Sequence, residues 1–210
     1  MRATRTLRVS LVPRTQNANL WSSQSQSLRV RVRCQAGPPF LIPFQNAGDK
    51  KGYSLRLYTP YPCVETRYIN RPDGYLALGS YMSGANASGT RFPETQPIVM
   101  QYAYKQGDEP QEKTMRVYLH GADDPPAPND PSVRLGVGGG EIVAAIKFEG
   151  NATKEVCEKY YNFLVARLRE DLGPASLPDD DRLEFSLAQY GPLHSLTPRL
   201  NEILVRVQLG

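Results

Sequence analysis

The sequence is poor in the residues that build metal centres and covalent catalysts. Among its 210 residues it has two histidines, His120 and His194, and three cysteines, Cys34, Cys63 and Cys157. Their spacing fits no zinc-binding motif, so Cys63 and Cys157 are expected to be buried structural thiols. The GxSxG, Walker A and GxGxxG signatures are missing as well, so the sequence lacks the motifs of three common types of enzyme site.

Acidic residues are missing from the first 48 positions, which contain seven arginines. The net charge of the chain is +4, so the remaining residues carry 4 − 7 = −3. A nucleic-acid interface requires a basic face on the folded domain, and nucleic acid is therefore not an expected partner. Runs of about 18 apolar residues are also lacking, so we expect no membrane-spanning helix, while peripheral membrane or lipid-body contact stays open.

Residues 1–35 have the composition of an organelle transit peptide. They are rich in arginine, serine and glutamine, contain no acid, and lack the compact apolar segment of a secretory signal. The frequency of serine and threonine favours the chloroplast over the mitochondrion, and the alternative is a basic arm that stays on the protein. We expect a linker at 36–51 and a folded domain at 52–210.

Alternating apolar residues and turn-forming residues predict eight strands and two helices. Their order is two strands, a helix and two strands, and this series occurs twice. We therefore expect an α+β fold, a curved antiparallel sheet or distorted eight-stranded barrel with two helices, built from a duplicated unit. Such a barrel could hold or flank one small ligand. The expected strands are 53–58, 63–68, 97–105, 113–120, 133–137, 141–150, 183–190 and 202–209, and the expected helices are 73–84 and 152–173.

The first expected helix has a weak apolar face. Tyr75, Leu78 and Met82 recur on it at helical spacing. Asp73 is expected to cap the start of this helix and Gly84 to end it.

The second expected helix has clearer signals. Thr153 is expected to cap its start and Gly173 to stop it. The glycine-rich stretch at 136–140 precedes this helix and predicts a hairpin between the two strands that flank it. The expected apolar face of the helix comprises Val156, Tyr160, Phe163, Leu164 and Leu168.

Three separated stretches carry a resemblance to a known family. They are YMSGANASGTRFPETQPIV (81–99), LHGADDPPAPNDPSVRL (119–135) and AQYGPLHSLTPRLNEILVRV (188–207). In this order they resemble the signatures of the SOUL/heme-binding-protein family, and the resemblance extends over about 52–208. The sequence of the first stretch is more similar to that of plant and algal plastid members than to that of animal members.

The resemblance implies a fold, a ligand and a site. The fold is a distorted barrel from a repeated strand-helix unit, and the ligand is heme or a related tetrapyrrole, bound reversibly. The site is the first helix together with the loop before the last strand. Family members carry a lysine where this chain has Ser80. The implied cofactor-binding residues are Arg71, Tyr75, Leu78, Gly79, Met82 and His194, with His194 as the metal ligand and Arg199 as a further cation nearby.

Each of these residues also has an ordinary structural interpretation. Met82 is a candidate core residue, Tyr75 a shield for the sheet, and His194 an exposed loop histidine. Three functions stay open: a non-enzymatic tetrapyrrole carrier or buffer in the plastid, a scaffold module at plastid lipid bodies or thylakoids, and an enzyme. The enzyme is the least favoured because the sequence offers no pair of nucleophile and base. The oligomeric state is not predicted.

Overall fold

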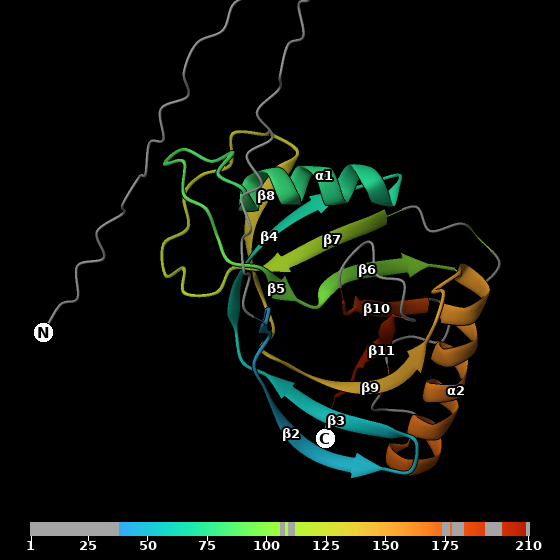
Figure 1. Ribbon diagram of the computed structural model, residues 1–210. Helices are drawn as coiled ribbons and strands as arrows, with labels where there is room; N and C mark the ends of the chain where they lie inside the picture. The colour runs from blue at the N-terminus through green and yellow to red at the C-terminus, as the bar shows by residue number, and fades with distance from the viewer. Residues whose placement is uncertain are drawn as a thin grey trace, which may run out of the picture. The chain divides into compact units, whose positions relative to one another are not determined.

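The computed structural model describes residues 38–105, 108, 112–173, 177, 183–191 and 199–208 of the chain. Within the compact unit Ala36–Gly210, two helices and a large curled antiparallel sheet form an α+β half-barrel, as the sequence predicted (Figure 1). The helices are α1 (Arg71–Met82) and α2 (Lys154–Leu172). The strands are β1 (Phe40–Leu41), β2 (Phe44–Lys50), β3 (Tyr53–Tyr58), β4 (Tyr61–Arg67), β5 (Thr95–Gln96), β6 (Ile98–Tyr104), β7 (Glu112–Tyr118), β8 (Val133–Gly138), β9 (Glu141–Glu149), β10 (Leu183–Gln189) and β11 (Leu200–Arg206).

The expected duplication is present in the order of the strands. The sheet runs β2-β3-β9-β11-β10-β6-β7-β4-β8, and β6 pairs with β10 at its centre. One half is β3-β4-α1-β6-β7 and the other is β8-β9-α2-β10-β11. Helix α1 contacts β4 and β7, and α2 contacts the equivalent strands β9 and β11 (Figure 1). Each half therefore places its helix against the same two of its strands.

The two halves exchange their first strands. Strand β3 pairs with β9 of the second half, and β8 pairs with β4 of the first half. The expected hairpin between β8 and β9 is therefore wrong, because the two strands lie at different places in the sheet. The glycines instead allow two chain segments to cross closely. A Cβ on Gly138 would lie 2.5 Å from the ring of Tyr61, one on Gly139 would overlap the carbonyl oxygen of Thr59, and the Gly140 N–H donates to the Tyr58 carbonyl at 2.7 Å.

Strand alternation gives the sheet two different faces. Along β6, Met100, Tyr102 and Tyr104 point to the side that carries the helices and join the main apolar core. Val99 points to the concave side, where a second, smaller apolar cluster lies. The helices thus cover one face only, and the concave face is free to carry polar groups.

Helix α1 begins two residues earlier than the expected range. Asn70 occupies the N-cap position without a side-chain capping bond, and Asp73 lies in the first turn, so the expected cap at Asp73 is wrong. The reason is Pro72, whose fixed backbone angle suits the first turn of a helix. Gly84 follows the C-cap Ser83 with φ +108°, and its N–H bonds to the Tyr81 carbonyl at 3.0 Å, which agrees with its expected role in ending the helix.

Helix α2 has the expected ends, but its buried face is rotated relative to the apolar face that the sequence predicted. The Thr153 hydroxyl accepts from the Val156 N–H, and Gly173 with φ +84° occupies the C-cap. Phe163, expected on the apolar face, is 50 % exposed and lies against Gly52 instead. The packing of α2 against the sheet, rather than the size of its apolar side chains, decides which side of the helix is buried. The buried residues are Cys157, Tyr161, Leu164 and Leu168, at positions i, i+4, i+7 and i+11.

The sheet has a ninth strand that the sequence did not reveal. Strand β2 lies in the segment 36–51, expected to be a linker, and its side chains are mostly exposed. It pairs with β3 through a register shift between Asn46 and Gly48. Apolar alternation could not predict it, because the main-chain hydrogen bonds to the edge of β3 hold the strand there.

Replacing Gly139 by alanine tests the crossing of the two segments. We expect Gly139→Ala to lower the free energy of unfolding by about 3 kcal/mol, since it adds an overlap with Thr59 to the strain of a positive φ. Gly121 is the matched control, because its φ of +71° is close to the +75° of Gly139 and its Cβ would meet no atom within 4 Å. Gly121→Ala should lose only about 1 kcal/mol. If urea unfolding shows that both variants lose the same free energy of unfolding, the close crossing at Gly139 is contradicted.

Candidate functional site

Most of the residues that the sequence analysis assigned to the site lie along one edge of α1. Arg71, Tyr75, Gly79 and Met82 are spaced at i, i+4, i+8 and i+11, so they follow one another along that edge. Arg71, Tyr75 and Met82 are half-buried and Gly79 is exposed. Leu78 differs from the others, because it is only 1 % exposed and belongs to the apolar core.

Tyr75 connects this edge to the end of the sheet. Its hydroxyl donates to Gln189 Oε1 on β10 at 3.0 Å, and Gln189 Nε2 donates to Asn201 Oδ1 on β11 at 2.9 Å. Asn201 Nδ2 then donates to the Gly150 carbonyl at 2.9 Å, in the segment that leads into α2. This chain of bonds fixes α1 against the strands that flank the loop before β11. No sequence signal identified Gln189, since the groups in this chain of bonds come from four separate segments.

Two arginines lie near the Tyr75 hydroxyl. Burial raises the pKa of Tyr75 above its ordinary value, while the positive charges of Arg71 and Arg199 act in the opposite direction. Arg71 Nη2 also donates to the Tyr102 hydroxyl and to the Ala152 carbonyl, both at 3.2 Å. The structure therefore brings both expected cations to one end of the α1 edge.

His194 lies outside the described residues, and its expected role as metal ligand stays a prediction. The loop that contains it leaves β10 near Gly191, whose N–H donates to Gln96 Oε1 at 3.1 Å. Among the described residues, no group of three or more histidines, cysteines or acids could hold a metal ion. His120, the other histidine, stacks on Phe40 with ring centroids 3.8 Å apart.

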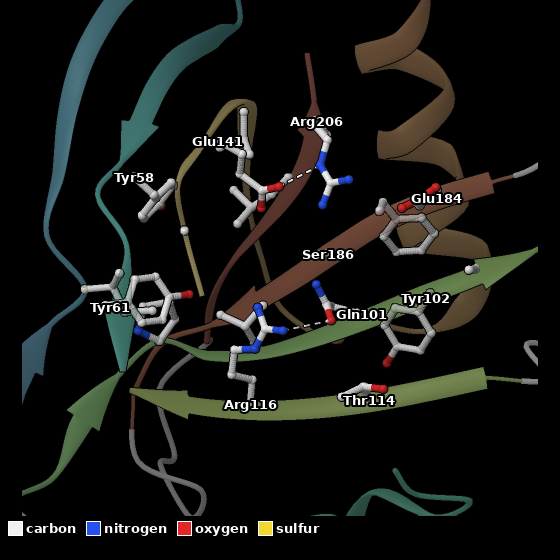
Figure 2. A pocket seen from close by; sticks show the side chains of 18 residues that line it. Tyr58, Tyr61, Gln101, Tyr102, Thr114, Arg116, Glu141, Glu184, Ser186 and Arg206 are labelled. Carbon is white, nitrogen blue, oxygen red and sulfur yellow. Dashed lines mark hydrogen bonds and ion pairs between the residues drawn. The ribbon is translucent and has the colours of Figure 1, made fainter. Parts of the chain in front are cut away.

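A second candidate site is a cavity of about 340 Å³ on the concave face of the sheet (Figure 2). Thr114, Gln101 and Ser186 lie side by side across its floor, because Gln101 pairs with both of the others in the strand register. Val99 and Leu204 provide apolar surface beside this polar row. The cavity can bind a small molecule that exchanges hydrogen bonds with uncharged side chains.

Ion pairs surround this concave cavity. Arg116 bonds to Glu65 through Nε at 3.0 Å and through Nη2 at 2.8 Å, and Arg134 bonds to the other oxygen of Glu65 at 2.8 Å. Arg206 pairs with Glu141 at 2.6 Å on the opposite side (Figure 2). Arg116, Arg206 and Glu141, which line the cavity, are thus already paired, which favours a polar ligand over a large apolar one.

Beyond the cavity, a buried ion pair ties β3 to β11. Arg56 Nη1 and Nη2 each donate to one oxygen of Glu202 at 2.8 Å, and the Tyr190 hydroxyl donates to Glu202 Oε2 at 2.8 Å. Both members of the pair are nearly inaccessible. Since all of these groups bond to one another, the arrangement stabilises the first strand of one half against the last strand of the other.

The described cysteines are unsuited to nucleophilic chemistry. Cys63 and Cys157 are both free and buried, as the sequence analysis expected. Burial raises the pKa of each thiol to about 11, with nearby Arg116 and Arg71 respectively acting in the opposite direction. At neutral pH both are therefore protonated thiols rather than reactive thiolates.

Solved structures of low sequence identity have the same fold. The crystal structure of the EcmrR C-terminal domain matches with a TM-score of 0.53 and 13 % identity, over 80 % of this chain and 99 % of that one. The crystal structure of a hydrolase from Listeria innocua matches with a TM-score of 0.52 and 10 % identity, over 77 % of this chain and 94 % of that one. At such identities the likeness concerns the fold alone. No curated protein matches the chain by sequence.

The fold and the site together define a class of protein, a two-helix half-barrel of duplicated halves with a partly exposed helix edge that has two arginines at one end. The model of the SOUL heme-binding protein family matches residues 41–206. The chain therefore belongs to the SOUL heme-binding protein family. Among the described residues, no helix is both long and apolar enough to cross a membrane.

The buried thiols predict how stability depends on alkaline pH. Both pKa values are about 11 in the folded protein against an ordinary 9.0, so the thiols stabilise the fold fully below pH 9. This contribution, about 3 kcal/mol per thiol, is lost as the pH rises from 9 through 11. Urea unfolding followed by circular dichroism should therefore show a falling free energy of unfolding from pH 9 upwards.

The double variant Cys63→Ala/Cys157→Ala is the control for this pH dependence. It should flatten the decline between pH 9 and 10. Above pH 10 a decline should persist, because burial also raises the pKa of Tyr53 and of Tyr61 to about 12. An unchanged slope between pH 9 and 10 would show that the thiols are not responsible.

Proposed function

We propose that this protein reversibly binds heme or a related tetrapyrrole along the edge of α1, next to the loop before β11. The observation that carries the proposal is that four residues implied by the family resemblance follow one another along this edge, with Arg71 and Arg199 at one end. A tetrapyrrole is a flat apolar plate with carboxylates on one side. Such a ligand suits a half-exposed helix edge that has cations near one end.

Gly79 supports the contact of a flat ligand with this edge. It is exposed, and a Cβ at this position would meet no atom within 4 Å. A planar ring can therefore approach the backbone of α1 closely between the half-buried side chains of Tyr75 and Met82. Leu78 supports the edge from the core and has too little exposed surface to make a large contact of its own.

The concave cavity is a less suitable place for a tetrapyrrole. Its volume of about 340 Å³ is near the lower limit of roughly 300–1,000 Å³ that is usual for small-molecule pockets. A macrocycle there would also remove the paired charges of Arg206 and Glu141 from water without forming new partners for them. Size and polarity therefore both favour the α1 edge.

The proposed role is that of a non-enzymatic carrier or buffer in the plastid. Binding at a partly exposed edge leaves the ligand accessible to a recipient protein, which suits reversible transfer. The segment 1–35 is rich in arginine and contains no acid, which supports a location in the plastid. The raised pKa values of Cys63 and Cys157 support a non-enzymatic role, since neither thiol is poised for attack.

A scaffold module at plastid lipid bodies or thylakoids is the second candidate function. Ile69 and Leu76, at the start of α1 and on its outer side, are 81 % and 73 % exposed. Large apolar side chains that face water next to a helix can contact a lipid surface or a partner protein. In this case the protein would bind no heme but would sediment with lipid vesicles.

Hemin titration followed by the Soret band separates the two candidates. We expect saturable one-to-one binding, and Gly79→Leu should weaken it about tenfold or more, since the new side chain occupies the proposed contact surface. The helix itself should gain about 0.5–1 kcal/mol from losing a glycine. Lys159→Leu, at an exposed position of α2, is the matched control and should bind hemin normally. A flat titration of the unaltered protein would reject the proposed function.

His194 is tested by substitution with alanine. If His194 ligates the iron, as we expect, His194→Ala shifts the Soret band of the hemin complex. His120→Ala is the control and should leave the band unchanged, since the His120 ring stacks on Phe40. A band that does not move in His194→Ala would exclude His194 as the ligand while leaving the α1 edge in place.

A further inference from the structure

The concave cavity has a floor of uncharged polar side chains. Thr114 of β7, Gln101 of β6 and Ser186 of β10 come from three adjacent strands and line it together (Figure 2). All three are half-buried, and they lie on the side of the sheet opposite the helices. Since neighbouring strands are about 4.8 Å apart, the row places hydrogen-bonding groups at regular intervals across the floor.

These floor side chains have hydrogen-bonding capacity that the protein itself leaves unused. Among the described residues, the hydroxyls of Thr114 and Ser186 bond to no other group, and Gln101 has only a long contact of 3.5 Å from Arg116 Nη2 to its Oε1. No buried side-chain nitrogen or oxygen in the described part of the chain lacks a partner, so the unused groups reach the open space of the cavity. A hydroxyl and a primary amide both donate and accept. A ligand on this floor must therefore have donors and acceptors side by side.

The charges in the lining of the cavity balance one another. Arg116 and Arg206 contribute two positive charges, and Glu141 and the exposed Glu184 contribute two negative ones. One further charge of each sign lies behind Arg116, on Glu65 and Arg134. A charged ligand of either sign would compete with these ion pairs, whereas a neutral ligand can bond to their remaining N–H groups and lone pairs without separating them. The balance therefore favours a neutral ligand.

Apolar surface lies between these polar groups. Val99 and Leu204 line the cavity beside the polar row, and Tyr61 forms part of its wall. Burial raises the pKa of Tyr61 to about 12, so its hydroxyl, which points into the cavity in Figure 2, keeps its proton and can donate. Polar groups thus approach a ligand from the floor and from the sides, and apolar surface contacts the parts of the ligand between them.

A small molecule with many hydroxyl groups matches this distribution. The ring of a sugar or a cyclic polyol has hydroxyls around its whole rim, each of which donates and accepts, and its C–H groups provide apolar surface. A molecule with a single polar end would satisfy one side of the cavity and leave the other polar groups unpaired, which weakens binding. The cavity volume of about 340 Å³ lies within the range of small-molecule pockets and is sufficient for a monosaccharide or a disaccharide.

We propose that the concave cavity binds a neutral, polyhydroxylated small molecule, a sugar or a cyclic polyol, on the row formed by Thr114, Gln101 and Ser186. The inference goes beyond the proposed function and does not rest on it. The cavity and the α1 edge lie on opposite faces of the sheet, and the residues assigned to the edge do not line the cavity.

Titrations of the full chain, followed by two-dimensional amide NMR spectra, test this proposal. The probes are D-glucose, sucrose and myo-inositol, and we expect at least one to bind saturably, with a Kd of about 1 mM, and to move the side-chain amide signals of Gln101. Cyclohexanol has the carbon ring of myo-inositol with one hydroxyl, and D-glucuronate and D-glucosamine are charged relatives of D-glucose. All three should bind more weakly than the tightest polyol.

Three outcomes of these titrations would overturn the proposal. The first is that none of the three polyols binds saturably. The second is that cyclohexanol binds as tightly as the tightest polyol, which would indicate an apolar site. The third is that D-glucuronate or D-glucosamine binds more tightly than every neutral polyol, which would indicate a site for a charged ligand.

Three variants of similar side-chain size assign the binding to the floor of the cavity. Thr114→Val, Gln101→Met and Ser186→Ala should each weaken binding of the tightest polyol by about three- to tenfold, since each removes hydrogen-bonding groups. Ser80→Ala, at an exposed position of α1, is the matched control and should leave the affinity unchanged. Because the substitutions lie on three different strands, the test stays valid if one variant fails to fold. Unaltered affinity in every folded floor variant would contradict the proposal.

Hemin separates this site from the α1 edge. Gln101→Met should leave the affinity for hemin unchanged, and Gly79→Leu should leave the affinity for the polyol unchanged. If saturating hemin abolishes polyol binding, the placement of the polyol on the concave face is overturned. If hemin does not bind at all, the proposed function fails, while the polyol titrations still decide the concave site.

Discussion

The close crossing of two chain segments at Thr59–Tyr61 and Gly138–Gly140 is the constraint on which the rest of this structure depends. There the two halves exchange their first strands, so that β3 completes the second half and β8 the first. Side chains at the crossing glycines would collide with Tyr61 and with the Thr59 backbone. The exchange joins the halves into one continuous curled sheet and leaves the helices together on one face.

The duplication also explains why charged groups gather between the helices. In each half the helix begins after an equivalent strand, β4 or β9, and both strands belong to the same sheet. The first residues of the helices, Arg71 and Lys154, therefore reach one pocket although they are far apart in the chain. Arg71 also bonds to the Ala152 carbonyl, which ties the start of one helix to the segment before the other.

The two faces of the sheet have different chemistry. On the helix side, apolar packing encloses residues such as Leu78 and Leu164, and the partly exposed edges of that packing suit a flat apolar ligand. On the concave side, paired charges such as Arg206 and Glu141 surround a smaller polar cavity. The buried pair Arg56–Glu202 lies on this side and links the first strand of one half to the last strand of the other. A tetrapyrrole and a small polar molecule would therefore be drawn to opposite faces of the same sheet.

The sequence by itself determined the order of eight of the strands and of both helices, the duplication and the ends of α2, because these depend on local signals such as the capping Thr153 and the stop at Gly173. It indicated the residues of the α1 edge through the family resemblance, although it placed Arg71 just before the expected helix rather than in its first turn. Only the tertiary structure decided the strand exchange, the rotation that exposes Phe163, the added strand β2, and the meeting of Arg71 with Lys154 at one pocket. Those features arise from pairing and packing between segments distant in the chain, and no local pattern of residues encodes which distant partner a segment meets.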